Sequence, residues 1–271
     1  MSLHDFQTAD GCRLAYTDQG SGLTVLWQHG LGADHNQPAE VFPSTEGIRR
    51  ITLECRGHGA SELGDIHAIS IAQFADDAIA LLDHLGIERA VFGGISLGAA
   101  VALRLAVKQP QRTVALILAR PAWIAENAPH GMKIYREVAR LLHQFGPQHG
   151  ALRFEASPLL HEIAHISPDN AASLRSFFTR DPISTVPLLD LIPDDGPGVF
   201  RSAIQALTCP TQIIANRQDF IHSMDTAETL AGLISQSRLS VITSKTLSRE
   251  QYLQGFREVL NDFLTTTLFA G

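Results

Sequence analysis

The segment Ala90–Gly98, AVFGGISLG, decides the fold of this chain. Its first residues are apolar and predict a buried strand, and the alanine-rich run after it predicts a helix over 99–107. Ser96 lies between these two elements in a Gly-x-Ser-x-Gly pattern. The glycines let the strand and the helix approach closely across a sharp turn that exposes the serine hydroxyl. We therefore predict that Ser96 is a nucleophile, the alternative being an ordinary turn whose serine caps the helix.

Strand-like and helix-like segments alternate on both sides of this turn. An opening hairpin is predicted over Phe6–Tyr16 around the Asp10–Gly11 dipeptide, and an amphipathic helix over Ile71–Leu85 starts with Ser70 and Gln73 as a capping box. Further buried strands are predicted over 23–27, 50–55, 114–118, 211–215 and 239–242, and further helices over 227–233 and 253–263. Such alternation is typical of a parallel sheet covered by helices on both faces, the α/β class.

The alternation stops between residues 121 and 200. No strand-like run occurs there, and helical spacing of apolar residues takes over, as in Ile134, Val138, Leu141 and Leu142. We predict a helical cap over 121–200, inserted into a core made of 1–120 plus 201–271.

Composition narrows the classes of partner. The 271 residues include 28 acidic against 21 basic side chains, a net charge of -7, which disfavours nucleic acid and anionic membranes. Cys12, Cys55 and Cys209 lie far apart without Cys-x-x-Cys spacing, so neither a disulfide framework nor a zinc site is expected, and a cytoplasmic location is predicted. No run reaches the roughly 20 apolar residues that span a bilayer, and no signal peptide is visible.

A second glycine-rich turn supplies hydrogen-bond donors. The segment Gln28–Gly32, QHGLG, follows a predicted central strand, and its turn can direct the N–H of Leu31 at the same point as the N–H of Leu97. Two such donors form an oxyanion hole, in which each donor is worth about 3 kcal/mol in the transition state. For His29 we predict a structural role that braces the loop by hydrogen bonds.

With these motifs, the chain resembles the α/β-hydrolase family, in particular its cap-bearing branch of small esterases and related hydrolases. The matching pieces are His29–Gly30, Arg56–Ser61, the turn around Ser96 and an acid at Asp219 after a buried strand. The resemblance is strong over 23–118 and weaker in the cap. It implies a mostly parallel eight-stranded sheet and a triad in the order Ser, Asp, His, with Ser96 as nucleophile and Asp219 as acid. An aspartate on a surface loop is the other interpretation of Asp219.

The family's catalytic histidine should lie just after the last strand, where this chain has Leu247. The sequence holds 12 histidines, and none follows His222. One interpretation is that hydrolysis is impaired or lost. Another is that Lys245, with a pKa lowered by burial, or His222, from the loop of Asp219, acts as a substitute base. Lys245 could equally be a solvated lysine and His222 a residue of the pocket rim, and Leu247 could be a substitution, natural or introduced.

A His-Glu-x-x-His pattern over His161–His165 can hold zinc on a helix. No third ligand is evident from spacing and the stretch falls in the predicted cap, so no metal and no cofactor is expected.

The sequence thus predicts a serine hydrolase of a small carboxylic ester or related acyl compound, either impaired or using a non-standard base. The alternative is a non-catalytic protein that binds a small molecule on the same scaffold. Epoxide hydrolases and haloalkane dehalogenases of this family have an aspartate at the position of the nucleophile. The serine at position 96 therefore excludes these two activities. A partly hydrophobic ligand is expected because the cap is rich in large apolar residues, namely Trp123, Leu141, Phe145, Phe154, Phe177 and Phe178.

Overall fold

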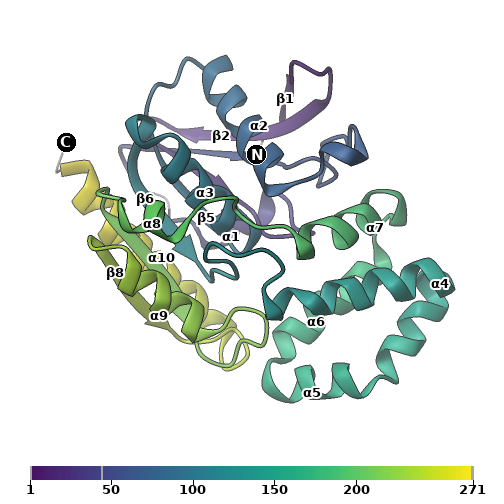
Figure 1. Ribbon diagram of the computed structural model, residues 1–271. Coiled ribbons are helices and arrows are strands. Elements are labelled where there is room, and N and C mark those ends of the chain that lie inside the picture. Colours follow the sequence, from purple (N-terminus) through teal and green to yellow (C-terminus); the bar gives the residue numbers. More distant parts are fainter. Residues whose placement is uncertain (1, 44, 270–271) are drawn as a thin grey trace.

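The computed structural model describes residues 2–43 and 45–269 (Figure 1). Eight strands form one sheet in the order β1-β2-β4-β3-β5-β6-β7-β8. The pairs β1–β2 and β2–β4 are antiparallel, and all the other pairs are parallel, which confirms the predicted sheet. The strands are β1 (His4–Gln7), β2 (Arg13–Gly20), β3 (Leu23–Gln28), β4 (Ile48–Leu53), β5 (Ala90–Ile95), β6 (Thr113–Ala119), β7 (Thr211–Asn216) and β8 (Ser237–Ile242).

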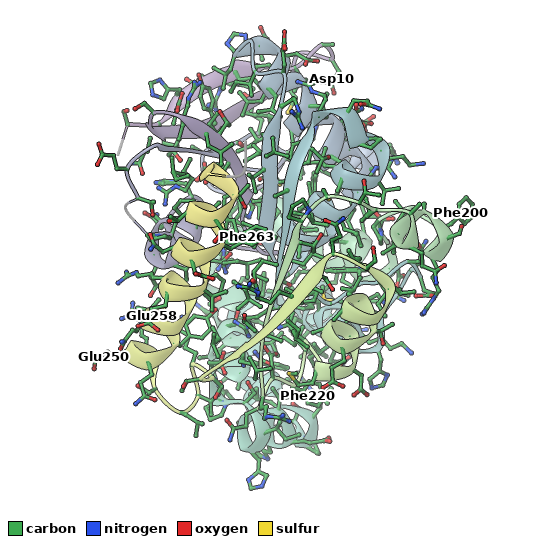
Figure 2. All side chains as sticks on the ribbon, turned by 90° about the vertical axis from the view of Figure 1, so that its left-hand side faces the viewer. Asp10, Phe200, Phe220, Glu250, Glu258 and Phe263 are labelled. Carbon is green, nitrogen blue, oxygen red and sulfur yellow. The ribbon has the colours of Figure 1, made fainter. Side chains whose placement is uncertain are left out.

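Helices cover both faces of the sheet. One face packs against α2 (Ile71–His84), α3 (Leu97–Lys108) and α9 (Met224–Leu233), and the other against α1 (Asn36–Val41) and α10 (Arg249–Phe269). Figure 2 shows α10 from outside, with Glu250 and Glu258 exposed, while Phe263 is buried. The short α8 (Arg201–Gln205) leads into β7.

Local sequence explains where α2 begins and ends. Its seven buried residues lie at helical spacing, and the Ser70 hydroxyl accepts a hydrogen bond from the N–H of Gln73 at 3.0 Å. The Gln73 side chain donates to Asp77 at 2.9 Å instead of returning to the helix start, so only half of the predicted capping box forms. Gly86, at φ +66°, follows the helix end, as a left-handed C-terminal residue does.

Four longer helices lie between β6 and β7 and form a lobe beside one edge of the core (Figure 1). They are α4 (Lys133–Glu155), α5 (Pro158–Ile166), α6 (Pro168–Ser176) and α7 (Pro182–Leu191). Gly146, at φ +68° before Pro147, bends α4. Trp123, Phe154 and Phe178 are buried in the same hydrophobic cluster as α2 and α3, so the lobe and that face share a continuous core. The division into a cap and a core stays a prediction.

Over residues 2–43 and 45–269, no helix combines the length and apolar character that crossing a bilayer requires. The three cysteines are free thiols, with Cys12 and Cys55 buried.

Candidate functional site

Ser96 occupies a strained turn between β5 and α3. Its backbone angles are φ 56° and ψ −111°, a region that non-glycine residues rarely adopt and that costs about 1–3 kcal/mol. A Cβ on Gly94 would lie 2.3 Å from the carbonyl carbon of Gly98, and a Cβ on Gly98 would lie 2.3 Å from the carbonyl oxygen of Gln28. Both glycines are therefore required by close backbone approach. The Ser96 N–H donates to the Ala119 carbonyl at 2.9 Å, which ties the turn to β6.

Ser96, His222 and Asp219 form a hydrogen-bonded chain. The Oγ of Ser96 lies 2.8 Å from Nε2 of His222, and Nδ1 of His222 lies 2.9 Å from Oδ1 of Asp219. An ionised carboxylate only accepts hydrogen bonds, so the proton of a neutral imidazole resides on Nδ1 and Nε2 accepts from the serine hydroxyl. His222 and Ser96 are buried, 8% and 7% exposed, and the side chain of Asp219 is 1% exposed. The arrangement can move a proton off the serine hydroxyl.

The carboxylate of Asp219 has a full set of partners. Oδ2 accepts from Nε and Nη2 of Arg120 at 2.7 and 2.6 Å, and Oδ1 also accepts from the N–H groups of Ile221 and His222 at 3.2 and 3.1 Å. Burial by itself would raise the pKa of Asp219, but the positive charge of Arg120, followed by the interaction with His222, holds this pKa well below its usual range. Asp219 is therefore ionised and fixed in orientation.

The loop that carries His222 is held by the helical lobe. Oδ1 of Asn170, in α6, accepts from the N–H groups of Phe220 and Ile221 at 2.9 and 3.1 Å. The backbone of Gly131, just before α4, packs so closely that a Cβ there would lie 2.1 Å from the Ile221 carbonyl oxygen. Figure 2 labels Phe220 on this loop. The position of His222 thus depends on contacts with residues outside the sheet.

The two predicted oxyanion donors flank the serine. Leu97 is the first residue of α3, so its N–H has no acceptor within the helix. Leu31 lines the same cleft as Ser96, and in the described part of the chain its N–H has no hydrogen-bond partner. His29 holds this loop in place, since Nδ1–H donates to the Gly30 carbonyl at 2.9 Å and Nε2 accepts from the Cys55 N–H at 3.0 Å. Burial lowers the pKa of His29, which suits a neutral, structural imidazole.

The segment between β8 and α10 holds the other two candidate positions, Leu247 and Lys245, and neither is hydrogen-bonded to Ser96. Leu247 is 66% exposed, and its N–H donates to the Ser244 carbonyl at 3.0 Å in a surface turn. Lys245 is half-buried and lines the cleft beside Ser96. An imidazole therefore lies against Ser96 although position 247 is leucine, and it comes from the loop of Asp219.

The cleft beside Ser96 has a volume of about 320 Å³. Its walls are largely polar, and none of the six large apolar residues of the lobe, on which the expected hydrophobic ligand rested, belongs to the described lining. Instead Trp123, Leu141, Phe154, Phe177 and Phe178 are buried in the core. The polar lining residues are Gln37, Ser96, Arg120, Tyr135, Asp169, Asn170, Ser173, His222 and Lys245.

Two groups of side chains contain residue types that bind metals. His161 and His165 are exposed on α5, and among the described residues no third ligand lies close to them. Asp34, His35 and Glu54 do bring ligand atoms within 4.8 Å of one another. However, Glu54 already accepts from Nδ1 of His35 at 2.6 Å and from the Ala60 N–H at 2.7 Å, so its carboxylate is engaged in hydrogen bonds within the protein.

Known proteins of similar sequence include hydrolases. A family model described as the alpha/beta hydrolase fold matches residues 24–244. The chain is 28% identical to a 2-hydroxymuconate semialdehyde hydrolase of Pseudomonas sp. (strain CF600), over 94% of this chain and 92% of that one. It is 28% identical to 3-oxoadipate enol-lactonase 2 of Acinetobacter baylyi, over 78% of this chain and 76% of that one.

Solved structures extend the likeness of the fold. A thermophilic esterase from Thermogutta terrifontis superposes with a TM-score of 0.75 at 24% identity, covering 98% of this chain and 99% of that one. The sheet, the turn at Ser96 and the match over 24–244 lead to one conclusion: the chain belongs to the α/β-hydrolase family.

Proposed function

We propose that this protein is a serine hydrolase of small carboxylic esters or related acyl compounds. Ser96 is the nucleophile, His222 is the general base, and Asp219 orients the imidazole. The observation that carries the proposal is the chain of hydrogen bonds of 2.8 and 2.9 Å that joins the three side chains at the strained turn. In this reading the activity is not impaired, because the base comes from position 222 in place of 247.

The reaction follows from these positions in two halves. In the first, Nε2 of His222 takes the hydroxyl proton as Oγ of Ser96 attacks the acyl carbon, and the same proton then passes to the leaving alcohol. In the second, His222 takes a proton from a water molecule whose oxygen attacks the acyl carbon, and the imidazolium returns this proton to Oγ of Ser96 as the bond from Oγ to the acyl carbon breaks and the acid leaves. The N–H groups of Leu31 and Leu97 stabilise the negative oxygen of each tetrahedral intermediate.

The relatives support hydrolysis as the reaction class without fixing the substrate. One is named a semialdehyde hydrolase and another an enol-lactonase, so their names specify different substrates. A cleft of about 320 Å³ suits a small acyl compound. We also propose the cytoplasm as the site of action, since the three cysteines are free thiols.

Covalent labelling tests the proposal directly. A fluorophosphonate reacts with a serine only when a base removes its proton, so we expect one phosphonyl group per chain, on Ser96. Intact-mass and peptide mass spectrometry would measure it, and Ser96→Ala should take up none. Ser173→Ala, which removes another hydroxyl of the cleft, is the matched control and should label fully. A folded protein that takes up no label would refute the proposal and favour the non-catalytic binder.

A histidine at the usual family position should add nothing. In Leu247→His the new imidazole would replace a side chain that is 66% exposed, while His222 already occupies the hydrogen bond to Ser96. We expect kcat/KM for an activated short-chain ester to change by less than about twofold, as for surface substitutions in general. A gain of orders of magnitude would mean that His222 does not serve as the base.

A further inference from the structure

The acceptor atoms of the cleft are already engaged. Oδ1 of Asn170 accepts two backbone N–H groups, and Oε1 of Gln37 accepts the Gly30 N–H at 2.7 Å. Oδ1 of Asp169 accepts the hydroxyl groups of Ser167 and Thr246 at 2.8 and 2.5 Å, and Oδ2 lies 3.5 Å from Nη2 of Arg120. A ligand that enters this cleft thus finds few acceptors that are free.

The donors of the same side chains remain. Since Oδ1 of Asn170 faces two N–H groups, the amide orientation is fixed, and Nδ2 has no partner among residues 2–43 and 45–269. The hydroxyl of Tyr135 and the ammonium of Lys245 also lack a hydrogen-bond partner in the described chain. Asn170 and Tyr135 are only 2% and 5% exposed, yet Nδ2 and the hydroxyl are not among the fully enclosed polar atoms. A ligand in the cleft can therefore reach both donors and accept their hydrogen bonds in place of water.

The two cations at the site, Arg120 and Lys245, equal the two carboxylates in number, and Lys245 is the cation that forms no ion pair. Arg120 donates to Asp219 through two nitrogens and also lies beside Asp169, whereas Lys245 forms no ion pair with any described residue. The backbone around it is anchored, because the Ser244 hydroxyl donates to Oε1 of Gln218 at 2.8 Å and the Thr246 hydroxyl donates to Asp169. These two anchored neighbours, one on each side, hold residue 245 at the wall of the cleft.

We propose that the cleft selects acyl compounds that carry a carboxylate in addition to the bond that is cleaved. The ammonium of Lys245 pairs with this carboxylate, and the Tyr135 hydroxyl and Nδ2 of Asn170 donate to its oxygens. A carboxylate fits because its two oxygens offer about four acceptor sites and one negative charge, matching one free cation and two neutral donors. The inference rests on the proposed function, since it names the substrate class of the same site.

Paired substrates test this selectivity. The 4-nitrophenyl monoesters of glutaric, adipic and suberic acid each have a neutral counterpart in which the free carboxyl is a methyl ester. We expect kcat/KM at pH 7 to favour at least one monoester over its neutral counterpart by about 10-fold or more, mainly through KM. In Lys245→Gln this advantage should shrink by about 10-fold to 100-fold while the neutral esters react as before. Tyr135→Phe should remove a smaller part.

Lys108→Gln is the matched control, because Lys108 is exposed at the end of α3 and the substitution changes the net charge equally. Equal rates on charged and neutral esters, unaffected by Lys245→Gln, would overturn the inference while Ser96 labelling still supports hydrolysis. Binding of monomethyl adipate to Ser96→Ala, measured by calorimetry, separates the two proposals. Binding that is weakened by a further Lys245→Gln would uphold the carboxylate site even if no ester were hydrolysed, and absence of binding would count against it.

Discussion

Replacing His222 by alanine is expected to lower kcat for ester hydrolysis by about 10⁴-fold to 10⁶-fold. The imidazole is the only group of the described chain that is hydrogen-bonded to Oγ of Ser96, so its removal leaves an unactivated hydroxyl. The N–H groups of Leu31 and Leu97 remain, and they alone should retain a residual rate above that of water. Steady-state kinetics on a 4-nitrophenyl ester, with circular dichroism to verify folding, measures the loss.

The matched control for this substitution is His165→Ala. His165 is exposed on α5 and outside the cleft, so kcat should stay within about twofold of the parent value. If His222→Ala keeps more than a tenth of the parent kcat, another group activates Ser96, and Lys245 becomes the first candidate because it lines the same cleft.

Replacing Arg120 by methionine is expected to lower the free energy of unfolding at pH 7 by about 3–5 kcal/mol and to abolish most activity. The Asp219 side chain is 1% exposed, and without Arg120 its negative charge would be buried with no cationic partner other than His222. The pKa of Asp219 would rise, since the largest of the interactions that lower it is gone. The carboxylate would also lose the two guanidinium hydrogen bonds that fix its orientation toward His222.

The free energy of unfolding should depend on pH in a direction that follows from the pKa of Asp219. In the parent protein the pKa of Asp219 is below its unfolded value, so this carboxylate contributes stability that is fully present above about pH 4 and is lost as the pH falls toward the folded pKa. In Arg120→Met the higher pKa of folded Asp219 makes this contribution smaller, so the free energy of unfolding should fall less steeply as the pH drops below 4. Urea titrations between pH 2 and 8 on both proteins measure the difference.

An exposed ion pair provides the comparison. Arg238 and Asp262 lie 2.9 Å apart with both side chains 67% exposed, so Arg238→Met should cost about 1 kcal/mol or less at any of these pH values. Equal losses in the two variants would mean that the contact between Arg120 and Asp219 has no special energetic role.

The sequence was most informative where backbone geometry restricts the residue type. The turn around Ser96 could be predicted because only glycine fits at Gly94 and Gly98, and the sheet because strands and helices alternate along the chain. The hydrogen bond from the Gln73 side chain to Asp77, in place of the predicted capping-box bond, could not be predicted. Both partners are available only once the helix has folded.

The proposed base, His222, shows the same limit. The resemblance to the family pointed to position 247, because in that family the catalytic histidine follows the last strand. A His three residues after an Asp in Asp219–His222 was a visible signal, but its meaning depends on a loop conformation that Asn170 and Gly131 impose from a distant part of the chain. Whether the cleft is apolar was equally hidden, since the aromatic side chains of the lobe pack inward.

The hydrogen bonds from Phe220 and Ile221 to Asn170 link the motion of their loop to that of α6. A fluctuation that moves α6 away from the sheet breaks two hydrogen bonds of the loop and, with them, the support of the imidazole three residues from Asp219. The place of His222 beside Ser96 is therefore coupled to the place of α6 against the loop, and a substitution of Asn170 should be felt at the imidazole although Asn170 is hydrogen-bonded to neither side chain of the pair.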